Sequence, residues 1–274
     1  MTQDQRLDLL VRRFLEESGE YRDLSPGDSP AEQRRLLRAL MNVRAPCPLD
    51  PDTLAVQDAY LRERNGEKGI VSPRDLETAA EALGSARPFA GRLCLWQGDI
   101  TRLAADAIVN VANSRMLGCF APLHGCIDNC IHTYAGIQLR AECARRMANL
   151  RRRYGEDYEQ PTAVPMLTGG YALPARHVIH VVGPIVADRL TPALEEDLAA
   201  CYRNVLDLCL DNGLRTVAFC CISTGVFRFP NDRAAELAVD TVTRWLRGHE
   251  DGMDRIVFNV FKDEDRALYE ALLR

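Results

Sequence analysis

From residue 92 onward, short runs of β-branched and apolar residues alternate with helical patterns, and this alternation is the strongest constraint on the fold. The runs are "RLCLWQ", "DAIVNVAN", "TAVPMLT", "RHVIHVVG", "RTVAFCCIS" and "RIVFNVFK". Their composition is typical of strands that are buried on both faces. Helical periodicity fills the intervals at about 127–150, 193–212, 231–248 and 264–273. The alternation predicts an α/β domain with a mixed, mainly parallel sheet.

The first 85 or so residues are predicted to be helical. Leucines recur at helical spacing in residues 7–15 and 36–41, and the proline-rich "APCPLDP" separates them from a further helical pattern. We expect a last helix with Ser72 as its N-cap, Pro73 in its first position and Gly84 at its end. The chain thus divides into a helical N-terminal extension over residues 1–88 and an α/β domain over residues 89–274.

Composition and charge narrow the classes of partner. The chain of 274 residues has a formal net charge of −5, and Arg146 with Arg151–Arg153 forms only a local basic patch. A nucleic acid is therefore not an expected partner. No run approaches the length of a membrane span and no apolar signal core opens the chain, so we expect no membrane partner. Ten cysteines spread through the chain predict free thiols in a reducing, cytoplasmic compartment.

Two loops follow predicted strands, where ligands of parallel α/β sheets bind. Asp99 lies in "WQGDIT" and could accept a hydrogen bond from an amine of a ligand. Ser223, Thr224 and Gly225 lie in "CISTGVFRFP", where small residues allow backbone N–H groups to approach an anion closely. Taken alone, each pattern is explained equally well by an ordinary turn.

The stretch "NSRMLGCFAPLHGCIDNCIH" concentrates thiols and imidazoles. Cys119, His124 and Cys126 have the spacing C-x4-H-x-C, and zinc is bound by such ligands in a tetrahedral arrangement. Three protein ligands leave the fourth position open, as in catalytic zinc sites. Cys130 lies four residues after Cys126, so as a fourth ligand it would close the site and make it structural. A third alternative is four ordinary thiols without a metal.

The predicted helix that follows carries two further candidates. Asp128 falls in its first turn, where the helix dipole stabilises a carboxylate, and it could also position a water molecule. We expect His132 to be a hydrogen-bonded core histidine. His177 and His180 fall in a predicted strand and are expected to be structural.

Three segments together resemble successive signatures of the macrodomain, the ADP-ribose-binding α/β fold. They are "GDITRLAADAIVNVANS", "AVPMLTGGYALPARHVIHVVGP" and "CISTGVFRFP". In place of the usual glycine-rich run, this chain has "GCFAPLHGCIDNCIH", which resembles the zinc-containing macrodomains of microbes. The helical extension of those proteins is similar to "LMNVRAPCPLDPDTLAVQDAYLRE". The resemblance covers the chain from about residue 30 to the end and implies a three-layer sandwich.

The resemblance also implies site residues. Asp99 matches the acidic residue that contacts the adenine amino group, with Ile100 beside it, and Asn113 matches the asparagine near the distal ribose. Asp128 matches the aspartate at the helix start, so Asn113 and Asp128 are the candidate catalytic residues. The matched zinc ligands are Cys119, His124 and Cys126. The loop around the diphosphate corresponds to Ser223, Thr224, Gly225, Val226 and Phe227.

The implied function is zinc-dependent hydrolysis of ADP-ribose from mono-ADP-ribosylated protein side chains, with acidic residues as the expected acceptors. Free ADP-ribose is an expected ligand, and family members are linked to a sirtuin-like ADP-ribosyltransferase and a lipoyl-carrier protein. Three alternatives stay open at this point. They are a non-catalytic reader of ADP-ribose, a deacetylase of O-acetyl-ADP-ribose, and a structural zinc protein with a closed Cys3His site.

Overall fold

A computed structural model describes all 274 residues of the chain. Its centre is a six-stranded sheet whose strands are β1 (Leu93–Gln97), β2 (Ala107–Val111), β3 (Met166–Gly169), β4 (His177–Val181), β5 (Thr216–Phe219) and β6 (Arg255–Val260). The strand order is β1-β6-β5-β2-β4-β3. Every neighbouring pair is parallel except β3 with β4, which is antiparallel at the edge. The predicted mixed, mainly parallel sheet is confirmed.

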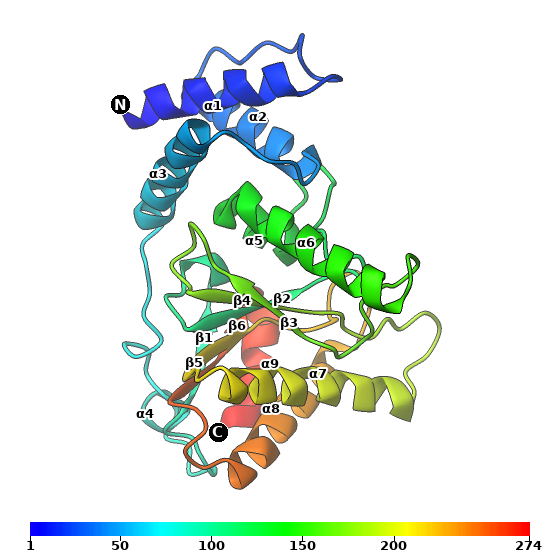
Figure 1. The fold of residues 1–274 in the computed structure, drawn as a ribbon. Helices are drawn as coiled ribbons and strands as arrows, with labels where there is room; N and C mark the ends of the chain where they lie inside the picture. Colours follow the sequence, from blue (N-terminus) through cyan, green and yellow to red (C-terminus); the bar gives the residue numbers. More distant parts are fainter.

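Helices cover both faces of the sheet and make three layers (Figure 1). One face carries α5 (Ile127–Ala135) and α6 (Ile137–Tyr154), and the other carries α7 (Pro192–Asp211), α8 (Asn231–Gly248) and α9 (Asp263–Leu273). Each interface has its own apolar core, of 20 buried residues on the α5–α6 side and 33 on the α7–α9 side. No helix combines the length and the apolar character that crossing a membrane requires.

Two helix predictions were wrong in their boundaries. The single helix expected at 127–150 is two helices, because Gly136 adopts φ +94° between α5 and α6. The helix expected to begin at Ser72 is the short α4 (Ala79–Leu83), with Thr78 as its N-cap and Gly84 at its end. Thr78 and Glu81 form a reciprocal capping box, which fixes this later start. Ser72 instead closes a turn, since its carbonyl accepts from Asp75 N at 3.0 Å.

The N-terminal helices form a separate small layer above α5 (Figure 1). They are α1 (Gln3–Glu17), α2 (Pro30–Val43) and α3 (Pro51–Glu67). Ten buried residues of these helices, among them Leu10, Leu40 and Tyr60, form one core with Ala172 of the α/β domain. Ala79 of α4 already belongs to the large core on the α7–α9 side. The division at residue 88 remains a prediction.

Candidate active site

The carboxyl ends of the parallel strands open into one cleft of about 730 Å³. Every residue that the sequence proposed for the site lines this cleft: Asp99, Ile100, Asn113, Cys119, His124, Cys126, Asp128, Ser223, Thr224, Gly225, Val226 and Phe227. Their convergence follows from the topology, because parallel strands bring the loops after them to one edge of the sheet. Their individual roles remain predictions.

Asp99 lies at one end of the cleft, as the N-cap of the short 3-10 helix η1 (Ile100–Arg102). Its Oδ1 accepts from Thr101 N at 3.0 Å and from Thr101 Oγ1 at 2.6 Å, and its Oδ2 lies 2.7 Å from Lys68 Nζ. Burial alone would raise the pKa of Asp99, but the bonds from Lys68 and Thr101 outweigh it and lower the pKa. An ionised carboxylate has about four acceptor sites, so about one is left for a donor of a ligand.

Lys68, which follows α3 in the N-terminal extension, was not predicted from the sequence. Its Nζ donates to Thr101 Oγ1 at 2.6 Å and lies 3.4 Å from the ring centroid of Tyr134, a residue that lines the cleft. One signal could have found it. Lys68 and Lys262 are the only lysines in the chain, and Lys262 also lines the cleft. The extension thus reaches the Asp99 end of the cleft.

The loop from residue 223 to 227 faces the middle of the cleft. The backbone N–H groups of these five residues donate no hydrogen bond within the protein. The hydroxyl of Ser223 is buried and also lacks a partner. The loop is closed by Phe229 N, which donates to Ser223 O at 3.0 Å. Unpaired N–H groups at a strand-to-helix connection are suited to bind an anion.

Gly183 supports this loop from behind. A Cβ on Gly183 would lie 2.2 Å from Ser223 Oγ, so any larger residue would force the Ser223 side chain to move. Ser223 itself adopts φ +66°. The loop is therefore held in a strained backbone conformation, as is common where ligands bind.

Cys119, His124 and Cys126 meet at the other end of the cleft. Their ligand atoms all lie within 4.8 Å of one another, and Cys119 Sγ is 3.6 Å from His124 Nδ1. Zinc bonds of about 2.3 Å to sulfur and 2.0 Å to nitrogen give a tetrahedral edge of about 3.5 Å. Burial raises the pKa of the Cys126 thiol to about 12, so its thiolate needs a compensating cation at neutral pH. The three residues therefore fit a zinc ion.

Cys130 lies outside this group of three, which bears on the closed-site alternative. Its sulfur is 3.7 Å from Arg38 Nη2 of α2, and it faces the extension. The structure therefore brings Cys119, His124 and Cys126 together and places Cys130 outside their group, while zinc binding itself remains a prediction.

The loop that carries these ligands is held by α2. Arg38 Nη2 donates to His124 O at 2.8 Å, and Asn42 Oδ1 accepts from Leu123 N at 3.0 Å. Leu123 adopts φ +58°, so the bond from Asn42 fixes an uncommon backbone conformation. These anchors were also missed, because they join residues more than 80 positions apart.

Asp128 and Asn113 lie beside the cysteine and histidine group. Asp128 is buried at the start of α5, and its Oδ1 accepts from Asn110 Nδ2 at 2.8 Å. Burial raises the pKa of Asp128 to about 6, and the bond from Asn110 partly offsets the rise. Asn113 is exposed; its Oδ1 accepts from Arg115 N at 3.1 Å and its Nδ2 donates to Gly118 O at 3.2 Å. One amide hydrogen of Asn113 stays free for a ligand.

The histidine predictions had mixed outcomes. His132 is buried as expected, but neither ring nitrogen has a hydrogen-bond partner, so the expected hydrogen bond was wrong. The acceptor beside it is Asp128 Oδ1, 3.5 Å from Nε2, which is too far for a hydrogen bond of normal length. Burial lowers the pKa of His132 well below its ordinary value. His180 lies in β4 as expected, 3.0 Å from both Asn110 Nδ2 and Thr168 Oγ1.

Comparisons with known proteins agree with the fold and the cleft. A family model described as "Macro domain" matches residues 109–238. Together with the six-stranded sheet between two helix layers, this match identifies the α/β domain as a macrodomain. A "Protein-ADP-ribose hydrolase" of Treponema medium is 44% identical over 277 residues and covers 100% of both chains. A protein of the same description from Staphylococcus aureus (strain MRSA252) is 41% identical and covers 97% of this chain and 94% of its own. The chain belongs to the protein-ADP-ribose hydrolase family of macrodomains.

Solved structures extend the similarity to three dimensions. The Trypanosoma brucei macrodomain in complex with ADP-ribose has a TM-score of 0.64 at 29% identity, covering 90% of this chain and 97% of that one. The Oceanobacillus iheyensis macrodomain with ADP has a TM-score of 0.57 at 36% identity and covers 66% of this chain and 89% of its own. The first of these similarities extends into the N-terminal extension, since it covers nine-tenths of the chain.

Proposed function

We propose that this chain is a zinc-dependent hydrolase that releases ADP-ribose from mono-ADP-ribosylated side chains of proteins, with aspartate or glutamate as the acceptor. Relatives that align over almost the whole chain are described as protein-ADP-ribose hydrolases. One observation carries the proposal. A single cleft combines an ionised carboxylate, five unpaired N–H groups and a three-ligand Cys/His group beside a buried aspartate.

ADP-ribose would lie along the cleft in the order of these groups. The free acceptor site of Asp99 would take the adenine amino group. The N–H groups of residues 223–227 would bind the two phosphates, which explains how a chain with net charge −5 can hold an anion. The distal ribose would then reach Asn113 and Asp128, next to the metal ligands.

The residues near the distal ribose would have separate roles in the reaction. Hydrolysis breaks the bond between the anomeric carbon and the side-chain oxygen, and water supplies OH to one product and H to the other. Cys119, His124 and Cys126 would hold a zinc ion, which supplies a positive charge that polarises a bound oxygen. With a pKa of about 6, the Asp128 carboxylate is mostly ionised at neutral pH and can accept a proton from water at its oxygen. Asn113 would hold ribose hydroxyls in one orientation.

The proposed partners follow the same reasoning. The substrate is an ADP-ribosylated protein, with a lipoyl-carrier protein as one proposed form, and free ADP-ribose is the product. A link to a sirtuin-like ADP-ribosyltransferase is also proposed. It is supported by a Fusarium oxysporum relative described as a "Probable bifunctional ADP-ribose hydrolase/ADP-ribosyltransferase", 40% identical over 89% of this chain and 41% of its own length. We also propose a cytoplasmic location, because all ten cysteines are free.

The test is release of ADP-ribose from a peptide that carries it on a glutamate, with and without a zinc chelator. We expect release by the purified protein, loss of release in the chelator and recovery on addition of zinc. Full release in the chelator, with no metal left in the protein, would contradict zinc dependence. Tight binding of ADP-ribose without any release would favour the reader. Release only from O-acetyl-ADP-ribose would favour the deacetylase.

A further inference from the structure

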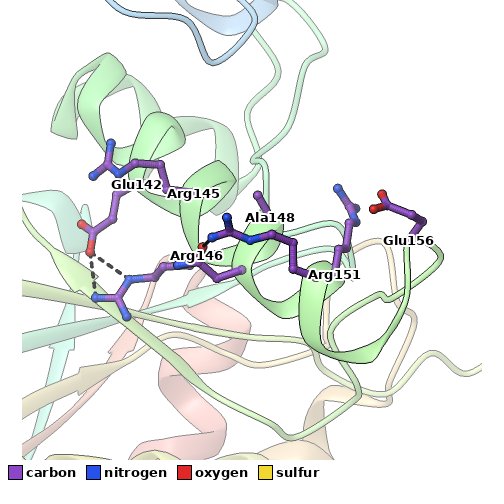
Figure 2. Close-up of a pocket in the computed structure, with 8 residues that line it drawn as sticks. Glu142, Arg145, Arg146, Ala148, Arg151 and Glu156 are labelled. Carbon is purple, nitrogen blue, oxygen red and sulfur yellow. Dashed lines mark hydrogen bonds and ion pairs between the residues drawn. The ribbon is translucent and has the colours of Figure 1, made fainter.

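Helix α6 carries a concave arginine face that the proposed chemistry does not use (Figure 2). The residues that line it are Glu142, Arg145, Arg146, Ala148, Asn149, Arg151, Arg152 and Glu156. Arg153 extends the same turn of the helix and lies over the ring of Tyr154. We call Arg145, Arg146, Arg151, Arg152 and Arg153 the α6 arginine face.

Most of the arginines in this face are not paired, although Glu142 and Glu156 also line the concavity. Only Arg146 forms an ion pair, with Glu142 at 2.8 Å. Glu142 is itself occupied inside the protein, since it accepts from Gly169 N at 3.0 Å and from the hydroxyl of Tyr171 at 2.7 Å. The other four arginines have no ion-pair partner. Their clustering is unexpected in a chain whose net charge is −5.

Helix stability alone does not account for the arginines. Cations in the last turn of α6 do interact favourably with the helix dipole, which would explain Arg151, Arg152 and Arg153. Arg145 lies more than two turns before the end of the helix, beyond the reach of that effect. It is exposed and has no ion-pair partner within the protein. A partner with negative charge would supply one.

A short series of contacts connects the C-terminal end of α6 to the end of the cleft that would hold the distal ribose. Arg151 Nε donates to Tyr158 O at 3.3 Å, and the chain then returns to the site, where Gln160 N donates to Ser114 O at 2.8 Å. Ser114 is the neighbour of Asn113, the residue proposed to face the distal ribose. These contacts place the C-terminal end of α6 within reach of a macromolecule attached to that ribose.

We propose that the α6 arginine face binds an acidic surface of the ADP-ribosylated protein and orients its modified side chain at the cleft. This inference rests on the proposed hydrolase function. Complementary charge increases the association rate of such partners by about 10- to 1,000-fold, and the gain falls with ionic strength. Free ADP-ribose would bind independently of this face, because its contacts lie within the cleft.

The experiment compares two double variants of equal charge change. Arg145→Glu with Arg152→Glu alters the arginine face, at positions seven residues apart on one helix. Arg244→Glu with Arg247→Glu is the control, on α8 across the sheet, where both side chains are exposed and unpaired. The substrates are two peptides with the same ADP-ribosylated glutamate, one with a 15-residue flank of alternating aspartate and serine and one with asparagine in place of aspartate. A fully extended flank of that length spans roughly 50 Å.

We expect the wild type to cleave the aspartate peptide at least tenfold more efficiently in kcat/KM than the asparagine peptide at low salt. The arginine-face variant should lose this preference, whereas the control should keep it. Salt at about 0.5 M should reduce the preference in the wild type, since the Debye length falls to roughly 4 Å. Affinity for free ADP-ribose, measured by calorimetry, should stay the same in all three proteins, which also shows that both variants are folded.

Other outcomes separate the two proposals. Equal cleavage of both peptides by the wild type, or an unchanged preference in the arginine-face variant, overturns the docking surface and leaves the hydrolase intact. Failure of the wild type to cleave either peptide overturns both proposals. A single-stranded oligonucleotide tests the alternative partner. If it binds the wild type and the control but not the arginine-face variant, and the wild type shows no preference between the peptides, the face binds nucleic acid and the acidic-protein proposal is overturned.

Discussion

Replacing Lys68 by methionine tests whether the N-terminal extension controls the adenine end of the cleft. The substitution keeps an unbranched side chain of similar length and removes the ammonium group. In the wild type this group lies 2.7 Å from Asp99 Oδ2 and 2.6 Å from Thr101 Oγ1. Without it, Oδ2 loses its donor in a side chain that is only 33% exposed. The carboxylate then loses the bond that directs its free acceptor site toward the cleft.

The magnitude follows from two opposing effects. The Coulomb energy of a pair 2.7 Å apart is roughly 6 kcal/mol at an effective dielectric of about 20. Desolvation opposes it, and burial is indeed the main reason why the pKa of Lys68 is lowered. Exposed pairs contribute about 0–1 kcal/mol and broken buried pairs cost about 3–5 kcal/mol, so we expect Lys68→Met to reduce the free energy of unfolding by about 1–2 kcal/mol. ADP-ribose affinity should fall about tenfold, or ~1.4 kcal/mol.

The pH dependence gives this prediction a second readout. The pKa of Asp99 is lowered in the folded protein, so its stabilising contribution is present above its unfolded pKa and is lost as the pH falls through the lowered value. In Lys68→Met, burial acts with less opposition and the pKa of Asp99 rises. The loss of stability and of ADP-ribose affinity should therefore begin at a higher pH than in the wild type.

The assay is calorimetric titration of ADP-ribose at pH 7.5 and pH 5, together with denaturant unfolding. Arg62→Met is the control, because Arg62 lies on α3 near Lys68 and is exposed. Asp99→Ala, which removes the carboxylate itself, should weaken binding by about tenfold to a hundredfold. Unchanged affinity of Lys68→Met at both pH values, beside a weakened Asp99→Ala, would refute the role of Lys68. Unchanged affinity of both variants would mean that adenine lies elsewhere.

Three further predictions concern the rest of the cleft. Metal analysis should find about one zinc per chain in the wild type and in Cys130→Ala, and none in Cys119→Ala. Equal loss of zinc in both variants would support the closed Cys3His site. Asn113→Ala should lower single-turnover release of ADP-ribose by about 100-fold, with a much smaller loss of ADP-ribose affinity; equal losses would make Asn113 a binding residue only. Gly183→Ala should weaken ADP-ribose binding more than tenfold, because its Cβ would lie 2.2 Å from Ser223 Oγ, and unchanged calorimetric affinity would show that the loop adapts.

The layers of the fold could be predicted from the sequence because each element carries its own periodicity. Buried parallel strands are apolar on both faces, and the helices between them are amphipathic, so neither signal depends on distant residues. The break at Gly136 was not predicted. A glycine within a helical pattern is compatible with an uninterrupted helix, and only its φ of +94° shows that α5 ends there. The late start of α4 was missed because Ser72 and Thr78 are both suitable N-caps.

The candidate site was predictable where its residues belong to one loop and unpredictable where they come from two distant segments. Strand ends pointed to Asp99 and to Ser223, Thr224 and Gly225, since the carboxyl edge of a parallel sheet is where such loops converge, and the resemblance to macrodomains added Val226 and Phe227. Lys68 gave no comparable signal. Its position 2.7 Å from Asp99 depends on how α3 packs against the domain, and residues 31 positions apart in the chain carry no local pattern that would reveal this.

Arg140 links the N-terminal extension to the loop that carries Cys119, His124 and Cys126. It is 5% exposed, and its guanidinium donates to five carbonyl oxygens. Three of these belong to the extension, at Met41, Asn42 and Arg44, and two belong to the loop, at Leu117 and Cys119. A buried cation is tolerated only when its donors are satisfied, so displacement of either segment would leave Arg140 with unsatisfied N–H groups at a cost of several kcal/mol. The position of Cys119 is therefore coupled to the packing of the N-terminal helices.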